Sequence, residues 1–233
     1  MRDIGRTKGL LYMNAGLIVA GGKSERLSGY DIPKQFIEIG GKPLVMYCLR
    51  AFELCHDIDI ICVVVAEEWR YILGDTVFAN PGKSRQHSIY NGLLALAPYD
   101  PEMVVIHDAA RPLVDAIDIS NVIKASSNYD GATPVIPVTD TIYRSFNGIT
   151  ITEALNRDEI YAGQTPECYN FRKYLAIHSN LSDNEISNVR GSSEIAVISN
   201  LRIALCEGNP HNFKVTTNSD LERFRAFVEN GEQ

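Results

Sequence analysis

The sequence predicts a doubly wound α/β fold with a mainly parallel sheet and a protruding β-arm. Segments with the spacing of amphipathic helices fall at residues 43–54, 83–96 and 116–127. They separate apolar runs rich in Val and Ile, which predict buried strands at residues 15–20, 58–66, 103–108 and 131–138. Apolar strands that alternate with amphipathic helices are typical of a parallel sheet covered on both faces.

The arm is predicted where this alternation stops, at about residues 139–165. That segment has β-branched stretches on both sides of the turn FNG, a pattern typical of a hairpin. After the arm, the sequence predicts helices near residues 170–179 and 192–199, strands at 201–207 and 212–216, and a final helix from about residue 219. We therefore expect a flexible lead-in over residues 1–14 and a single domain over residues 15–233.

The composition argues against several classes of protein. The chain has 233 residues and a formal net charge of −7, which disfavours a nucleic-acid-binding face. No apolar run approaches the roughly 20 residues that span a bilayer, so we expect no membrane partner. The five cysteines form no CxxC pair, which disfavours a disulfide framework and a zinc site. These features favour a cytoplasmic protein with reduced thiols.

The stretch LIVAGGKSERLSGYDIPKQF, residues 17–36, places glycines and cations directly after a buried strand. Gly21 and Gly22 allow close approach to a ligand and positive φ, and their N–H groups can form an anion-binding nest. Arg26 and Lys34 add positive charge, and Pro33 fixes the chain before Lys34. The pattern matches neither G-x-G-x-x-G nor G-x-x-x-x-G-K-[ST], which disfavours a dinucleotide-dependent dehydrogenase and a Walker-type ATPase. A phosphate site is favoured over an ordinary loop with surface cations.

A second candidate anion site lies in PGKSRQHSIYNGL, residues 81–93. Gly82 precedes a predicted helix whose first turns carry Lys83, Ser84, Arg85 and Ser88. A helix N-terminus with hydroxyl groups favours an anion or the edge of a nucleobase. An N-capped surface helix explains the same residues equally well.

Two further candidates are Asp108 and Lys214. Asp108 ends the strand in VVIHDAARPLV, at the edge where open α/β sheets bind ligands, and a carboxylate there can hold a divalent cation or a sugar hydroxyl. Alternatively, Asp108 caps the next helix and pairs with Arg111. Lys214 in HNFKVTT either faces solvent from an edge strand or points into the same cleft. We expect His107 to be structural.

The motifs AGGxxxR…PKQF, GxxRxxS, HDAARP, DT, QTP and NxKVT, in this order, resemble one family. They resemble the 2-C-methyl-D-erythritol 4-phosphate cytidylyltransferases of the non-mevalonate isoprenoid pathway, from residue 15 onward. The related ribitol-5-phosphate cytidylyltransferases share most of these motifs. The resemblance implies a Rossmann-like fold similar to nucleotide-diphospho-sugar transferases, with CTP and a polyol phosphate as substrates. It also implies Mg²⁺ bridging the CTP phosphates, release of pyrophosphate, and a homodimer through the β-arm.

The resemblance further implies roles for individual residues. Cations that act on the transition state are Arg26, Lys34 and Lys214. Nucleotide-binding residues are Ala20, Gly21, Gly22, Lys23, Ser24, Gly82, Lys83, Arg85, Ser88, Asp108 and Ala109. Acceptor-binding residues are Asp108, Arg111, Thr141, Arg157, Thr165 and Ser192. Asp108 is the expected metal ligand, and Arg157 lies on the arm, which in the family crosses to a second subunit.

The sequence departs from the family pattern at two places, the first in the glycine turn and the second in a segment that concerns the acceptor more than the chemistry. A glycine of the G-x-G turn is Ser24 here, and the T-D-E/D segment is GSSE, residues 191–194. Methylerythritol phosphate is the leading acceptor and ribitol 5-phosphate the alternative. HDAARP disfavours a sugar-1-phosphate nucleotidylyltransferase that uses UTP or GTP. The joint presence of Arg26, Lys34, Asp108 and Lys214 disfavours a non-catalytic nucleotide-binding regulator.

Overall fold

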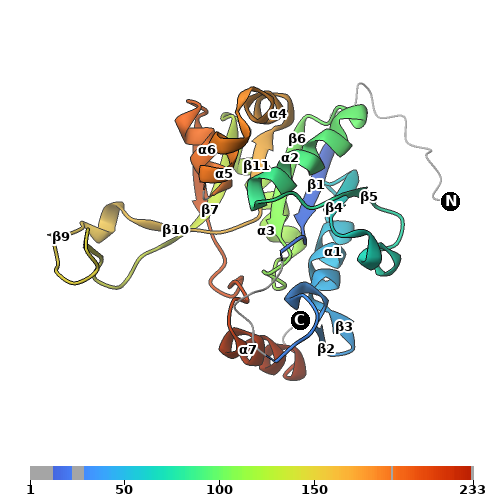
Figure 1. Ribbon diagram of the computed structural model, residues 1–233, viewed down its shortest axis with the longest axis horizontal. Coiled ribbons are helices and arrows are strands. Elements are labelled where there is room, and N and C mark those ends of the chain that lie inside the picture. The colour runs from blue at the N-terminus through green and yellow to red at the C-terminus, as the bar shows by residue number, and fades with distance from the viewer. Residues whose placement is uncertain (1–12, 23–28, 190, 232–233) are drawn as a thin grey trace.

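A sheet of eight strands forms the centre of the computed structural model, which describes residues 13–22, 29–189 and 191–231 (Figure 1). Its path runs β10-β7-β11-β6-β1-β4-β5, and β12 pairs with β7. The strands are β1 (Asn14–Val19), β4 (Ile60–Val64), β5 (Val77–Ala79), β6 (Met103–Asp108), β7 (Gly131–Pro137), β10 (Tyr161–Gly163), β11 (Glu167–Asn170) and β12 (Ile203–Glu207). Strands β5, β4, β1 and β6 are parallel neighbours, whereas β11 runs antiparallel to β6 and β7.

Helices cover both faces of the sheet. They are α1 (Leu44–Leu54), α2 (Arg85–Leu96), α3 (Ala116–Ala125), α4 (Phe171–Asn180), α5 (Asp183–Asn188), α6 (Ser192–Ile198) and α7 (Asn218–Glu229). Ile18 of β1 belongs to the core that contains Phe52 of α1 and Val122 of α3. The preceding residue, Leu17, belongs to the opposite core with Leu93 of α2. Since successive strand residues point to opposite faces, the sheet is doubly wound as predicted.

Most predicted elements are present, with small differences at their ends. The strand predicted at residues 212–216 is wrong: that segment is an extended loop, and the Val215 N–H donates to the carbonyl oxygen of Ala110 at 2.7 Å. The sequence analysis also missed the short elements β5, β11 and α5. Their lengths of 3, 4 and 6 residues are too short for a clear apolar period. Most of the predicted lead-in, residues 1–12, lies outside the described residues.

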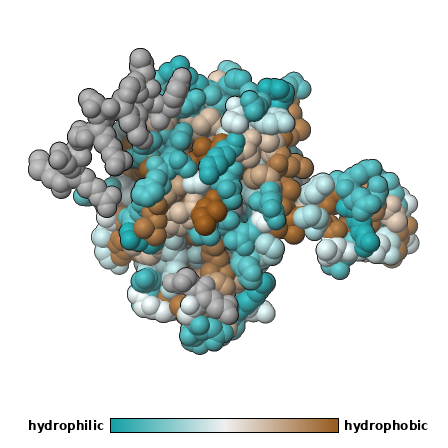
Figure 2. Space-filling view, turned by 180° about the vertical axis from the view of Figure 1, so that it is seen from behind, coloured by the Kyte–Doolittle hydropathy of each residue, from teal (hydrophilic) through white to brown (hydrophobic). Residues whose placement is uncertain are grey.

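The predicted arm projects from the body of the molecule (Figure 1). It carries the hairpin of β8 (Tyr143–Arg144) and β9 (Glu153–Ala154) and the 3-10 turn η4 (Arg157–Glu159), and it returns through β10 to pair with β7. Phe146 and Ile149 near its tip are 83% and 87% exposed. Figure 2 shows apolar residues on this arm, which stands apart from the rest of the surface. The arm therefore has little core of its own.

A smaller core fixes the loop that precedes α7. Leu221 and Phe224 of α7 pack with Leu44 of α1 and with Val215, all of them buried. Next to this core lie the 3-10 turn η1 (Lys34–Phe36) and the small sheet of β2 (Glu38–Ile39) and β3 (Lys42–Pro43). The remaining 3-10 turns are η2 (Glu67–Ile72) and η3 (Ala97–Tyr99). Among the helices of the described residues, none has both the length and the apolar character needed to cross a membrane.

Candidate active site

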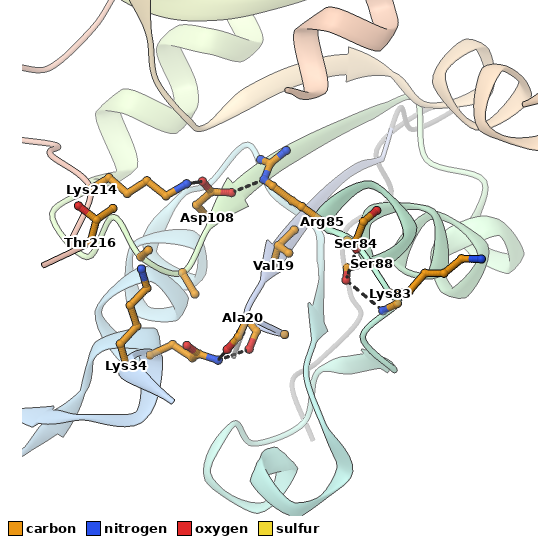
Figure 3. Close-up of a pocket in the computed structure, with 16 residues that line it drawn as sticks. Val19, Ala20, Lys34, Lys83, Ser84, Arg85, Ser88, Asp108, Lys214 and Thr216 are labelled. Atoms are coloured by element: carbon orange, nitrogen blue, oxygen red, sulfur yellow. Dashed lines mark hydrogen bonds and ion pairs between the residues drawn. The ribbon is translucent and has the colours of Figure 1, made fainter. Parts of the chain in front are cut away.

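A cavity of about 580 Å³ opens at the carboxyl ends of β1 and β6, the edge at which open α/β sheets bind ligands (Figure 3). It is lined by the turn after β1, the loop that leads into α2, the end of β6 and the loop before α7. The predicted catalytic cations Lys34 and Lys214 line it. So do nine predicted nucleotide-binding residues: Ala20, Gly21, Gly22, Gly82, Lys83, Arg85, Ser88, Asp108 and Ala109. The other three predicted residues of these two groups, Lys23, Ser24 and Arg26, lie outside the described residues.

Gln35, a residue that the sequence analysis did not single out, holds the glycine turn. Its Nε2 atom donates to the carbonyl oxygens of Ala20 at 2.6 Å and Gly22 at 2.9 Å. A Cβ atom at Gly21 would lie 2.6 Å from the Cβ atom of Pro81, so the close approach of two loops requires a glycine there. Neither Gly21 nor Gly22 adopts the positive φ that glycine allows. A Cβ atom at Gly22 would meet no described residue within 4 Å, so packing against these residues does not explain that glycine.

The loop that leads into α2 is ordered by its own hydroxyl groups. Ser84 caps the helix by accepting from the His87 N–H at 3.3 Å. The Ser88 hydroxyl accepts from the Gly82 N–H at 3.0 Å and donates to the carbonyl oxygen of Ser84 at 2.9 Å. A Cβ atom at Gly82 would lie 2.4 Å from the Cβ atom of His87. The capped helix start is also a wall of the cavity, so the helix cap does not exclude an anion site at this segment.

Asp108 lies between two cations from distant parts of the chain (Figure 3). Its Oδ1 atom accepts from Arg85 Nε at 2.7 Å, and its Oδ2 atom accepts from Lys214 Nζ at 2.7 Å. Burial opposes ionisation of this carboxyl group. The two cations outweigh burial and hold the pKa of Asp108 well below its usual range. Lys214 thus points into the cleft rather than away from it.

The alternative interpretation of Asp108 is wrong. Asp115, not Asp108, caps α3, where it forms a capping box with Asp118. Arg111 does not pair with Asp108: its Nη1 atom donates to the carbonyl oxygen of Asn212 at 2.7 Å.

Two more lysines reach the cavity from other segments. Lys34 Nζ donates to the carbonyl oxygen of Val215 at 2.7 Å, which places it beside the loop that carries Lys214. Lys83 pairs with Asp183, the first residue of α5. With Arg85, these lysines surround the cavity with positive charge, and charge-assisted hydrogen bonds to phosphate oxygens are among the strongest that proteins make.

None of the residues predicted to bind only the acceptor lines this cavity. Thr165 and Ser192 are buried behind its wall, 6% and 1% exposed. The Asp108 N–H donates to Thr165 Oγ1 at 3.2 Å, and Arg85 Nη1 donates to Ser192 Oγ at 2.6 Å. Both side chains therefore support residues that face the cavity.

Thr141 and Arg157 are exposed on the arm. Arg157 Nη1 donates to the carbonyl oxygen of Thr139 at 3.0 Å, a contact within the arm itself. These two side chains are not brought together with Asp108 in one chain.

His107 is structural, as expected. It is fully buried, with Nδ1 at 3.1 Å from Thr165 Oγ1 and Nε2 at 3.0 Å from the carbonyl oxygen of Arg111. Burial lowers the pKa of His107 to about 4, so the ring is neutral at physiological pH. The ring fixes Thr165 behind Asp108.

Buried amides fix the loop that carries Lys214. Gln164 and Asn209 exchange two hydrogen bonds, at 3.0 and 3.1 Å, and Asn212 Nδ2 donates to the carbonyl oxygen of Thr165 at 2.8 Å. The motifs QTP and NxKVT mark this region, but contacts between side chains and backbone leave no period in a sequence. The sequence analysis therefore missed these three residues.

A metal site made by the protein alone is absent from the described residues. No group of three or more His, Cys, Asp or Glu side chains among them could hold a metal ion. Asp108 is the one carboxylate among the described residues that line the cavity. Mg²⁺ commonly binds through one or two carboxylates together with substrate phosphates, so the cavity suits an ion that arrives with a nucleotide.

Known proteins match this chain over nearly all of its length. A family model described as "IspD: 2-C-methyl-D-erythritol 4-phosphate cytidylyltransferase" matches residues 15–230. The 2-C-methyl-D-erythritol 4-phosphate cytidylyltransferase of Clostridium botulinum is 36% identical over 221 residues, which cover 89% of this chain and 94% of that protein. The crystal structure of the 2-C-methyl-D-erythritol 4-phosphate cytidylyltransferase from Thermus thermophilus superposes with a TM-score of 0.75 at 25% identity, over 91% of this chain and 98% of that one.

Other relatives are longer than this chain. The bifunctional enzyme IspD/IspF of Granulibacter bethesdensis is 36% identical over 216 residues, which cover 90% of this chain but 54% of that protein. The chain thus spans about half the length of the bifunctional relatives that it matches.

Proposed function

The chain belongs to the IspD family of 2-C-methyl-D-erythritol 4-phosphate cytidylyltransferases, and from this premise we propose that it transfers CMP from CTP to 2-C-methyl-D-erythritol 4-phosphate and releases pyrophosphate. The observation that carries the proposal is the ion-paired cluster at the sheet edge, where Asp108 joins Arg85 to Lys214 and Lys34 faces the same cavity. Nucleotidyl transfer needs alignment and neutralisation of charge more than covalent catalysis, and this cluster supplies both.

Different groups of residues contribute to different parts of this reaction. A phosphate oxygen of the acceptor attacks the α-phosphorus of CTP, and the bond to the leaving pyrophosphate breaks. Backbone N–H groups of the glycine turn and of the Gly82 loop hold the nucleotide. Lys34 and Lys214 stabilise the negative charge that develops on the phosphate oxygens. Each ammonium group has three donors, so both lysines can contact phosphate while they keep their protein acceptors. Arg26 is proposed as a further cation.

Mg²⁺ is part of this proposal as an ion carried by the CTP phosphates, with Asp108 as its protein ligand. When bound, the ion neutralises phosphate charge and polarises the bond that breaks. Asp108 suits this role because its pKa lies well below its usual range, so the carboxylate is charged at any physiological pH.

A homodimer with shared sites is also proposed. It is supported by the exposed apolar side chains of the arm, among them Phe146 and Ile149, and by the separation of Thr141 and Arg157 from the cavity of their own chain. We further propose a cytoplasmic location, because all five cysteines are free thiols, as expected in a reducing compartment.

The test is release of pyrophosphate from CTP with each acceptor in parallel reactions at saturating Mg²⁺. We expect turnover with methylerythritol phosphate, a lower kcat/KM with ribitol 5-phosphate, and little activity when UTP replaces CTP. A kcat/KM about tenfold higher with ribitol 5-phosphate would reverse the acceptor assignment and leave cytidylyl transfer intact. No release with either acceptor would contradict the proposed function.

A further inference from the structure

Glu167 is a buried carboxylate that the proposed function leaves unused. It begins β11, lies opposite Ile106 of β6, and is 5% exposed. The next residue, Cys168, belongs to the core under α1 and α3, whereas Tyr169 belongs to the opposite core. Because strand residues alternate, Glu167 points to the same face as Tyr169. A buried carboxylate is destabilising unless it is hydrogen-bonded, so this position requires a partner.

That partner is Ser193 in the first turn of α6. The Ser193 hydroxyl donates to Glu167 Oε1. The same hydroxyl lies 3.1 Å from Thr133 Oγ1 of β7 and accepts from the Tyr169 hydroxyl at 3.4 Å. Three strand residues therefore anchor the start of α6 to the sheet, and Glu167 is the charged one.

The neighbouring residue, Ser192, connects this anchor to the cavity. Its carbonyl oxygen accepts from the Tyr174 hydroxyl at 3.1 Å, and its hydroxyl accepts from Arg85 Nη1 at 2.6 Å. The other side of the same guanidinium group donates from Nε to Asp108. Arg85 is thus held between α6 and the end of β6, and Asp108 in turn holds Lys214.

Glu167 also acts on this cluster through its charge. Burial lowers the pKa of the Arg85 guanidinium group, but the carboxylates of Asp108 and then Glu167 raise it by more. Burial lowers the pKa of the Arg111 guanidinium group, and the carboxylates of Asp108 and then Glu167 oppose that shift without reversing it. The negative charge of Glu167 therefore stabilises the charged forms of both arginines.

We propose that Glu167 is a positioning residue for the acceptor: it fixes the start of α6 through Ser193, so that Ser192 and Asp108 hold Arg85 in one orientation at the cavity wall. The proposal rests on the proposed function and on the acceptor roles that the family resemblance implies for Ser192, Thr165 and Asp108. Arg85 lines the cavity with the nucleotide-binding residues and acts on the acceptor through Asp108, which it holds. Loss of the Glu167 charge should therefore weaken use of the acceptor more than binding of CTP.

The test compares Glu167→Gln with Glu102→Gln. Gln has the shape of Glu and can still accept from Ser193, so the first variant removes mainly the charge. Glu102 is exposed and precedes the start of β6, the end of that strand opposite Asp108, which makes the second variant a matched control. We expect Glu167→Gln to lower kcat/KM for the acceptor about tenfold, or about 1.4 kcal/mol, with the KM for CTP nearly unchanged. Glu102→Gln should match wild type in both.

A double-mutant cycle with Ser193→Ala tests whether Glu167 acts through that contact. If it does, the double variant should lose little more acceptor kcat/KM than the more damaged single variant, because both changes break the same connection. Additive losses would contradict the proposal. So would wild-type kinetics in Glu167→Gln, or an equal loss for CTP and acceptor together with a lowered Tm, which indicates a merely structural role.

Hydrogen exchange tests the positioning role of Glu167 independently of the proposed cytidylyl transfer. Amides that donate to carbonyl oxygens of the first turn of α6 should exchange faster in Glu167→Gln than in Glu102→Gln, with or without substrates. An inactive wild-type enzyme would contradict the proposed function, and the exchange measurement would still test Glu167. Unchanged exchange at α6 would overturn the positioning role whatever the activity.

Discussion

The nucleotide half and the acceptor half of the predicted site are built in different ways. All nine described residues predicted to bind the nucleotide line one cavity, whereas none of the five predicted to bind the acceptor alone does. Thr165 and Ser192 stand behind the cavity wall, and Thr141 and Arg157 lie on the arm. The described residues of the nucleotide half thus line one cavity of a single chain, whereas the acceptor half depends on supporting contacts and on an arm that projects away from that cavity.

The topology explains this difference. Residues that follow parallel strands meet at one edge of the sheet, so the turn after β1 and the end of β6 come together in any chain with this fold. The arm leaves β7 and returns through β10 without contributing to that edge. In the proposed homodimer the arm instead contributes to the site of the second chain, a division that the following variants test.

The largest effect is expected in the nucleotide half, from Lys34→Ala. We expect kcat to fall by about 10² or more, with a smaller change in the KM for CTP, because the ammonium group acts on charge that appears mainly in the transition state. Steady-state kinetics of pyrophosphate release measure both values. Lys124→Ala, which removes an exposed lysine of α3, is the control.

Lys34→Arg tests whether catalysis requires the ammonium group of Lys34 in particular. A planar guanidinium group cannot replace a compact ammonium group that donates to the carbonyl oxygen of Val215, so this variant should also be impaired. Turnover near the wild-type rate in Lys34→Ala would remove Lys34 from the catalytic residues.

The acceptor half is tested by Arg157→Ala. Loss of one charge-assisted contact to the acceptor phosphate should reduce kcat/KM for the acceptor about 10-fold to 100-fold. Arg144→Ala, on the same arm, removes an exposed arginine that pairs with Glu153 inside the hairpin and is the control. Parallel titrations of acceptor and CTP show which substrate is affected.

Mixing the two impaired variants decides whether the site is shared. In a dimer of one Lys34→Ala chain and one Arg157→Ala chain, one of the two shared sites contains no substitution. An equimolar mixture that exchanges subunits freely should therefore recover about a quarter of wild-type activity. If the arm serves the cavity of its own chain, the mixture will stay as inactive as its components.

Much of the fold and of the nucleotide half could be predicted from the sequence. Long apolar strands and amphipathic helices have clear periods, and the residues that follow strands fall at the ligand edge for topological reasons. Asp108 and Lys214 are far apart in the chain, yet the sequence predicts both as site residues. Asp108 ends a strand, and Lys214 is a cation in an apolar segment.

The rest depends on tertiary contacts that have no local pattern. Gln35, Gln164 and Asn212 act through hydrogen bonds to backbone groups of other segments. The loop at residues 212–216 has the composition of a strand, but it is held by α7 and by these amides instead of by a ladder. No sequence pattern pairs Glu167 with Ser193, because this contact depends on how α6 packs against β11 in the folded chain.

Two glycines of the nucleotide half should respond differently to alanine. Gly82→Ala forces a Cβ atom against His87 and should destabilise the fold by about 1–3 kcal/mol. Gly22→Ala meets no atom of the described residues within 4 Å, so its Tm should equal that of wild type while its KM for CTP rises several-fold. Thermal unfolding and CTP titration measure the two effects. A lowered Tm with normal CTP binding in Gly22→Ala would show that packing, not the ligand, requires that glycine.

The last effect is a pH dependence of stability through His107, which fixes Thr165 behind the acceptor half. Its pKa is about 4 in the folded protein because the ring is buried, and about 6.5 in an unfolded chain. Between these values the unfolded state binds a proton that the folded state does not. The free energy of unfolding should therefore fall as the pH is lowered from 6.5 to 4, by up to about 3 kcal/mol from this residue.

Urea unfolding at several pH values measures this fall. His178 is also fully buried, with a pKa lowered to about 4, so wild type loses stability through both rings over the same interval. His107→Gln should be less stable than wild type at pH 7, because Gln cannot reproduce both ring contacts, but its stability should depend less steeply on pH between 6.5 and 4. Retention of the wild-type slope would mean that His107 is not the neutral, buried support of Thr165, and that the acceptor half is held in another way.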